Sequence, residues 1–271
     1  MREQAGHVYV AHVLKQSPAL CGGLHDGDEI LEVSALPVRT PRAVSGLIAG
    51  AAARPLPMQI SRAGTIFNLA LTPAVRPTDG ELARLDLIGA PLHALYTLSA
   101  VRGKAPTQAE LVGHVVLVEH GASWCAPCAA SAPILQALAA KFPPTSLVVL
   151  GATREAGASA ALAYAQQGVS KSTVGLGAAP FSILRDETGD VSGGASVSLL
   201  PTFVLYGPDG TARWVHAGGG PDLAAMLNAQ VEHAIATPKL PVLPAVLPNR
   251  DACGQPLPPG VTSSIRPAGQ E

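Results

Sequence analysis

The sequence is poor in charged residues and lacks any long apolar run. Only 14% of its 271 residues are charged and the net charge is −1, so there is no electrostatic basis for binding nucleic acid. No run of 18 apolar residues occurs, which predicts that no segment spans a membrane. Met1–Gln4 leads into no apolar signal-peptide core.

Cysteine is also scarce, whereas apolar residues are plentiful. Only two of the four cysteines stand close together, and Cys21 and Cys253 stand alone. We expect Cys21 to face solvent and, as a lone cysteine, to be inert. The apolar share of 48% is enough for packed cores, and the charged share is too low for disorder throughout. The length fits two domains of ordinary size.

The stretch from Val115 to Pro133 organises the rest of the chain. It starts with four apolar residues, 115–118, whose β-branched members predict a buried strand. Cys125-Ala-Pro-Cys128 then opens an Ala-rich helix. A separation of three places both cysteines on one helix face. Their Cα atoms can then lie at the roughly 5.5 Å that a disulfide needs.

The two cysteines differ in their place on this helix. Cys125 lies where the helix begins, so unpaired N–H groups and the helix dipole stabilise its thiolate. The pKa of this thiol should therefore lie well below the free value of about 8.5. Cys128 lies one turn further in. We expect Cys125 to attack substrates and Cys128 to resolve the product.

This region resembles the thioredoxin family. Trp-Cys-Ala-Pro-Cys at 124–128 matches its redox motif, and Pro133 matches the proline that kinks its active-site helix. Glu119, six residues before Cys125, lies where thioredoxins carry a buried acid. Residues 200–206, Leu-Pro-Thr followed by Phe-Val-Leu-Tyr, resemble the cis-proline loop and the strand after it.

The resemblance implies an α/β thioredoxin-like domain over 82–236, with a mixed central sheet flanked by helices. It implies a protein disulfide oxidoreductase without a cofactor, whose partners are proteins with cysteines or disulfides and an upstream thiol–disulfide electron donor. Glu119 would accept the proton of Cys128. Pro201 would leave the backbone beside the sulfurs free to pair with an extended substrate. Trp124, Leu200 and Gly218 are the candidate substrate-binding residues.

The stretch between 82 and 113 is longer than the entry to plain thioredoxin. A hairpin expected there and the pair Gly103-Lys104 resemble the membrane-anchored, TlpA/ResA-like reductases of cytochrome c maturation. Some of these carry a glutamate six residues after the first cysteine, where this chain has Ser131. Any proton handling by that glutamate is therefore absent here or falls to Glu119.

Residues 7–73 predict a small α+β, mostly β domain. The pattern includes strands at 8–14 and 29–33, helices from Ser17 and Pro41, and a hairpin around Gly64. The order of Ser-Pro-Ala at 17–19 and Gly-Asp-Glu-Ile at 27–30 resembles a bacterial PDZ domain. The loop that binds a peptide carboxylate in such domains would lie within the first six residues, which contain no apolar-Gly-apolar motif. A peptide or protein partner and a purely structural role both stay open.

Two prolines in residues 72–80 predict a linker, placed at 74–81, and the Pro-rich residues 237–271 predict an extended tail. A PDZ-like domain joined to a thioredoxin-like domain suggests, by resemblance, an extracytoplasmic bacterial protein of the periplasm or cell envelope. Its export or anchor segment would be missing from this chain.

Other functions stay open at the level of the sequence. The chain could be a PDZ-containing adaptor with secondary redox activity, or a protein that handles metal with its thiol pair. Cys-x2-Cys is also metal-ligand spacing, and His114 and His120 lie nearby. No second such pair follows, so we expect no metal site. A reductase of the cytochrome c maturation type is favoured, but the motif does not fix the direction of electron flow.

Overall fold

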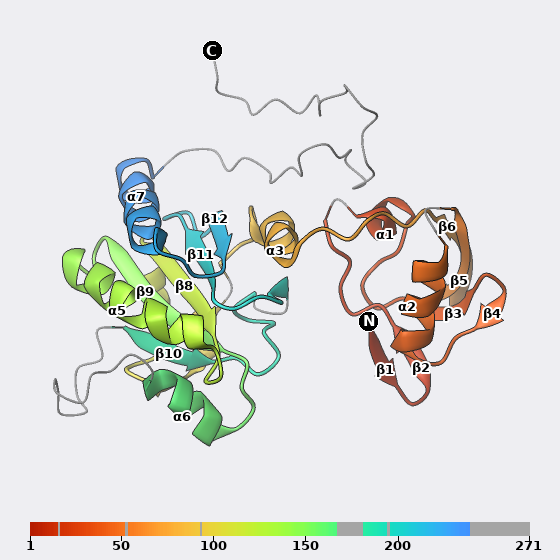
Figure 1. Cartoon of the computed structure of the whole chain (residues 1–271), viewed down its shortest axis with the longest axis horizontal. Helices are drawn as coiled ribbons and strands as arrows, with labels where there is room; N and C mark the ends of the chain where they lie inside the picture. Colours follow the sequence, from red (N-terminus) through yellow and green to blue (C-terminus); the bar gives the residue numbers. More distant parts are fainter. Residues whose placement is uncertain (16, 52–53, 93, 167–180, 194–195, 239–271) are drawn as a thin grey trace, which may run out of the picture. The chain divides into compact units, whose positions relative to one another are not determined.

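The computed structural model describes residues 1–15, 17–51, 54–92, 94–166, 181–193 and 196–238. These residues divide into two compact units, Met1–Pro77 and a second unit that begins at Thr78 (Figure 1). Most of the expected tail, and Cys253 with it, lies outside the described residues. No helix in the described ranges is long and apolar enough to cross a membrane.

The first unit is built on an antiparallel sheet with the strand order β1-β2-β3-β5-β6, in which β4 also pairs with β3. Met58 and Ile60 of β5 point into one core, where they meet Val33 of β3 and Val44 of α2. Its elements are β1 (Arg2–Gln4), β2 (His7–Tyr9), α1 (Pro18–Cys21), β3 (Glu29–Val33), β4 (Leu36–Pro37), α2 (Pro41–Gly50), β5 (Leu56–Arg62) and β6 (Thr65–Leu71).

The start of this unit differs from the prediction. The strand expected over 8–14 ends at Tyr9, and an additional strand, β1, precedes it. Ala5 and Gly6 both have positive φ angles, of 51° and 77°, which is the backbone of a tight two-residue hairpin turn. Ser34 and Ala35, with φ of 53° and 61°, form the same kind of turn without a glycine.

An ion pair with a buried carboxylate joins two segments of the first unit. Asp28 is fully buried, and Arg62 donates to both of its carboxylate oxygens at 2.7 Å. Arg62 also donates to the carbonyl of Gly23 at 2.7 Å. The hydrogen bond from Arg62 lowers the pKa of Asp28. This pair therefore ties the loop before β3 to the end of β5.

The second unit is a mixed sheet with the strand order β12-β11-β8-β9-β10-β7. Strands β8, β9 and β10 run parallel, whereas β11, β12 and β7 are antiparallel to their neighbours. Its elements are α3 (Asp79–Leu87), η1 (Leu95–Thr97), β7 (Ser99–Arg102), α4 (Gln108–Leu111), β8 (Val115–Gly121), α5 (Ala126–Lys141), β9 (Leu147–Thr153), α6 (Ala158–Gln166), β10 (Ser182–Arg185), β11 (Thr202–Tyr206), β12 (Ala212–Ala217) and α7 (Leu223–Ala236).

Strand β8 separates two cores, and all of its residues are buried. Val115 and Leu117 face a core that includes side chains of α5, α6 and α7. Val116 and Val118 face the opposite core, which includes side chains of α3, η1 and α4. The predicted mixed sheet flanked by helices is therefore present, and Glu119 shares the face of Leu117 because side chains alternate along a strand.

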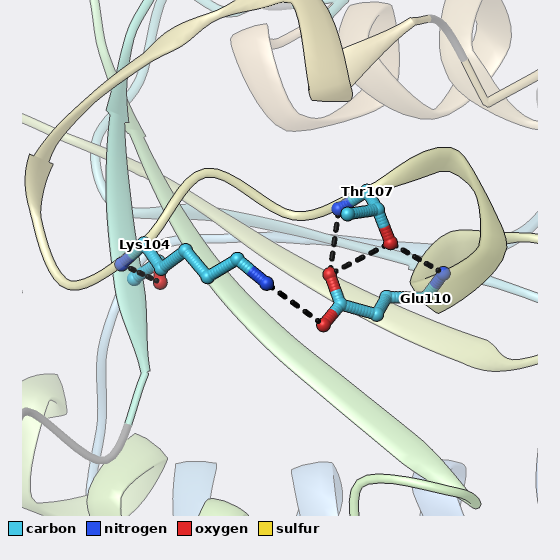
Figure 2. A network of polar contacts seen from close by, with 4 residues as sticks. Lys104, Thr107 and Glu110 are labelled. Carbon is cyan, nitrogen blue, oxygen red and sulfur yellow. Dashed lines mark hydrogen bonds and ion pairs between the residues drawn. The ribbon is translucent and has the colours of Figure 1, made fainter.

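The segment before β8 differs from the prediction in two ways. Strand β7 pairs with β10 rather than with a hairpin partner. Helix α3 begins at Asp79, inside the range expected to be a linker, and Thr78 and Glu81 form a capping box at its start. Helix α4 begins with a similar box, in which Thr107 and Glu110 bond reciprocally while the Lys104 ammonium lies 3.5 Å from Glu110 (Figure 2).

Candidate active site

A disulfide joins Cys125 and Cys128 at the start of α5, with Cα atoms 5.3 Å apart. Cys125 is the N-cap residue, and its sulfur accepts a hydrogen bond from the Cys128 N–H at 3.2 Å. Pro127 lies in the first helical turn, where its missing N–H costs nothing. The donor that points at the Cys125 sulfur would also stabilise its thiolate after reduction.

The two sulfur-bearing residues are buried beside an exposed ring. Cys125 is 3% exposed and Cys128 is 1% exposed, whereas Trp124 is 75% exposed. Trp124 therefore presents exposed apolar surface directly beside the disulfide.

The loop before β11 lies beside the motif. Its Leu200–Pro201 peptide bond is cis, and Thr202 pairs with His120 at the end of β8. The Pro201 carbonyl accepts a hydrogen bond of 2.7 Å from the N–H of Gly218. A Cβ atom on the next residue, Gly219, would lie 3.4 Å from the side chain of Pro127. The Pro201 loop and the glycines after β12 therefore both approach the cysteine-bearing helix.

A pocket of about 550 Å³ opens next to the motif, lined by Trp124, Leu200, His120 and Arg154 among others. His120 is buried, and its Nε2 atom has no hydrogen-bond partner among the described residues. Burial lowers the pKa of His120 to about 4, so its ring is neutral near pH 7. At the sequence level His120 was considered only as a zinc ligand, and its place in this pocket was missed.

Glu119 lies buried on β8, where it is 2% exposed. The Tyr164 hydroxyl donates to its Oε2 atom at 3.1 Å, and the Ser131 hydroxyl donates to its Oε1 atom. Burial raises the pKa of Glu119 to about 7, although both hydrogen bonds and the charge of Arg102 favour the carboxylate. A carboxyl group with this pKa can take up or release a proton near neutral pH.

Arg102 is the charged neighbour of this carboxyl group. It extends from β7, donates to the carbonyl of Ala165 and stacks over the ring of Phe181 at 4.9 Å. Burial lowers the pKa of Arg102, and the nearby Tyr164 and Glu119 act against that shift. Ser131, Tyr164 and Arg102 come from α5, α6 and β7, and sequence reasoning assigned none of them a role with Glu119.

The remaining cysteine of the described chain is not a free thiol. Cys21 is exposed, as expected, but it takes part in a disulfide. The expectation that Cys21 stands alone was therefore wrong, and its inertness stays a prediction. Among the residues that the structure describes, no three side chains of His, Cys, Asp or Glu gather as they would around a metal ion.

Taken together, the sheet order, the disulfide at the start of α5 and the cis peptide beside it define a thioredoxin-like domain. Such a pair can store two electrons, because the disulfide and the dithiol interconvert by thiol–disulfide exchange. Glu119, which lies among Tyr164, Ser131 and Arg102, adds a buried carboxyl group whose pKa burial raises to about 7.

No protein-family model matches the chain, and no curated protein is recognisably similar to it. Among solved structures it resembles a Chlorobium tepidum protein provisionally assigned as the thiol:disulfide interchange protein DsbE, with 24% identity and a TM-score of 0.43. That match covers 55% of this chain and 99% of the other. A secreted Mycobacterium tuberculosis disulfide oxidoreductase homologous to E. coli DsbE shares 23% identity, with 50% and 93% of the chains covered and a TM-score of 0.39.

A third such structure is the exposed lipoprotein thioredoxin Etrx1 of Streptococcus pneumoniae, with 21% identity and a TM-score of 0.40. The match covers 50% of this chain and 96% of that one. Because these scores are low, the assignment of the fold depends on the strand order and connections of the chain itself.

Proposed function

We propose that this protein is a thiol–disulfide oxidoreductase that reduces disulfides of other proteins. The observation that carries the proposal is the pairing of a disulfide at a helix start with a buried carboxyl group, Glu119, whose pKa is about 7. A base that is hydrogen-bonded to the helix of the pair, through Ser131, serves the reducing direction in particular, because Cys128 must lose a proton before it can attack a mixed disulfide.

The reduced pair would act in two steps. The Cys125 thiolate attacks one sulfur of the substrate disulfide, the substrate S–S bond breaks, and one substrate thiolate leaves. Cys128 then gives its proton to the Glu119 carboxylate, and its thiolate attacks the Cys125 sulfur. This forms the Cys125–Cys128 disulfide and releases the second substrate thiolate. Two electrons pass from the pair to the substrate, the released thiolates take protons from water, and an upstream dithiol donor reduces the pair again.

Substrate would bind across the surface around Trp124, Leu200 and Gly218. Trp124 supplies exposed apolar area, and Pro201 has no N–H that would compete with the backbone of an extended substrate. Gly218 adopts a φ of +102°, which other residues rarely adopt, and its N–H holds the Pro201 carbonyl. These contacts support a site for polypeptide rather than for a small molecule enclosed in a cavity.

We place the protein outside the cytoplasm, in the periplasm or cell envelope. The support is the disulfide at Cys21, which lies outside the redox motif, because disulfides of this kind persist in oxidising compartments. The assignment to cytochrome c maturation depends on the sequence resemblance to the TlpA/ResA-like reductases.

For the first unit we propose a PDZ-like domain at 7–73 that contacts a protein partner, with the thioredoxin-like domain at 82–236. The support is the antiparallel sheet with α2 packed on it through Val44, together with the resemblance of residues 17–30. In the alternative adaptor function, partner binding by this unit would be the main activity and the cysteines would be secondary.

Reduction of insulin by the full chain, with dithiothreitol as the electron donor, tests the proposal. We expect turnover with the wild type and background turnover with Cys125→Ser. Turnover by Cys125→Ser equal to that of the wild type would contradict the proposal and favour the adaptor. The reduction potential of the pair, measured against glutathione, tests the reducing direction.

A further inference from the structure

The Ser131 hydroxyl lies between two acceptors that belong to different parts of the candidate site. One is Oε1 of Glu119 on β8, and the other is the backbone carbonyl of Cys128, 2.8 Å away in the same helix. Ser131 is 1% exposed, so no bulk water competes for these bonds. A serine hydroxyl carries only one hydrogen. It can therefore donate to Glu119 or to the Cys128 carbonyl, but not fully to both.

The ionisation of Glu119 decides between these two bonds. A carboxylate is the stronger acceptor, so the serine hydrogen points at Glu119 when this group is charged. When Glu119 is protonated, Tyr164 still donates to Oε2, and the acid hydrogen is best placed on Oε1. That hydrogen then points at the Ser131 oxygen, and the serine hydrogen is released to the Cys128 carbonyl.

We propose that Ser131 is a positioning residue whose hydroxyl reverses between Glu119 and the Cys128 carbonyl, and so couples the buried carboxyl group to the helical turn of the resolving cysteine. Its part in turnover depends on the proposed oxidoreductase function, whereas the reversal itself does not. During exchange, Glu119 would take up the proton that the Cys128 thiol loses. This uptake would turn the Ser131 hydroxyl toward the backbone carbonyl of Cys128. Loss of that proton to water would turn the hydroxyl back.

The other groups that face Glu119 cannot perform this reversal. Tyr164 donates from α6 and Arg102 contributes positive charge from β7, but neither side chain has a hydrogen bond to the backbone of the cysteine helix in the described structure. Glu155 acts electrostatically on Tyr164. Serines in helices commonly bond the preceding turn for structural reasons alone. The added feature at Ser131 is the titrating carboxyl group as the competing acceptor.

The test follows two carbon atoms by NMR in the oxidised, 13C-labelled full chain. In the wild type, the side-chain carboxyl carbon of Glu119 and the backbone carbonyl carbon of Cys128 should titrate with the same midpoint near neutral pH. In Ser131→Ala the Glu119 midpoint should rise by about one pH unit, because the carboxylate loses a donor. The Cys128 carbonyl should then no longer follow it.

Three further variants serve as controls. Ser131→Thr keeps the hydroxyl and should restore both titrations. Ser45→Ala, an exposed serine of α2 in the other unit, should leave both unchanged. In the Glu119→Gln variant, adding Ser131→Ala should not further change the pH dependence of the Cys128 carbonyl carbon shift.

A Cys128 carbonyl that is silent while Glu119 titrates in the wild type would overturn the inference, even if Ser131→Ala failed to fold. An unchanged Glu119 midpoint in folded Ser131→Ala would overturn it as well. Both readouts use oxidised protein and need no substrate, so they are independent of insulin turnover. Absent turnover with intact coupled titrations would contradict the proposed function alone.

Discussion

The hydroxyl of Tyr164, on α6, donates a hydrogen bond of 3.1 Å to Glu119, on β8, across 45 residues of sequence. The bond favours the charged carboxylate, while burial favours the neutral acid. Tyr164→Phe removes the donor and keeps the ring. We expect the pKa of Glu119 to rise by about one unit. The pH midpoint at which insulin turnover increases should move up by the same amount. Insulin turnover between pH 5 and 9 measures this, and an unmoved midpoint would contradict it.

The same tyrosine ring lies against the backbone of Gly121. A Cβ atom at this position would lie 2.5 Å from both the hydroxyl oxygen and a ring carbon of Tyr164. Gly121→Ala should therefore displace the ring, break its bond to Glu119 and destabilise the second unit. Gly46→Ala in α2 is the matched control, because nothing lies within 4 Å of its added Cβ and alanine favours helices. Melting curves that place both variants at or above the wild type would refute the close contact.

Glu119 should make stability depend on pH. Its pKa rises from 4.5 to about 7 on folding, so between these values the folded state holds more protons than the unfolded state. Linkage then requires the contribution of Glu119 to the free energy of unfolding to fall as pH rises through this window, by about 3 kcal/mol in all, and to level off above it. The lowered pKa of His120 acts in the opposite direction, so the comparison with a variant at position 119 isolates the contribution of Glu119. Glu119→Gln, which cannot ionise, should lack this fall. Urea unfolding at pH 4, 6 and 8 measures the difference, and parallel curves for the two proteins would mean that Glu119 titrates as it does in the unfolded chain.

The Asp28–Arg62 pair should matter to the first unit alone. Arg62→Met leaves the fully buried Asp28 without its charged donor, and the carboxylate is then costly to bury. The lowered pKa of Asp28 means that the pair stabilises the fold above the unfolded pKa, and that this contribution is lost as pH falls. We expect faster amide exchange in β3 and β5 near pH 7, with no change in β8. Equal exchange in β3 before and after the substitution would contradict this.

Local sequence patterns predicted most elements but few of their long-range contacts. The apolar run at 115–118 and the alanine-rich segment with Cys125 and Cys128 sufficed for β8 and α5. The strand at 29–33 was also confirmed. The partners of Glu119 were missed because Ser131, Tyr164 and Arg102 converge only after α5 and α6 pack on the sheet and β7 joins its edge. No spacing in the sequence encodes that convergence.

The first strand was misplaced for a different reason. The run at 8–14 has the composition of a long strand, but the residues after Tyr9 leave the sheet. The N–H of Val10 instead donates to the carbonyl of Asp28 at 2.8 Å, and the N–H of Val13 donates to the Asp26 carboxylate at 2.6 Å. Tertiary hydrogen bonds of this kind override local β-propensity.

The most direct test of the central claim is a trapping experiment with Cys128→Ser. This variant keeps the attacking Cys125 and removes the resolving sulfur, so a substrate disulfide should remain attached to Cys125. After incubation of the reduced variant with oxidised insulin, mass spectrometry should find a covalent adduct on Cys125 that dithiothreitol removes. The double variant Cys125→Ser, Cys128→Ser should show none. If reduced, folded Cys128→Ser forms no adduct with insulin, or forms it at a residue other than Cys125, the account of this protein as a disulfide reductase is contradicted.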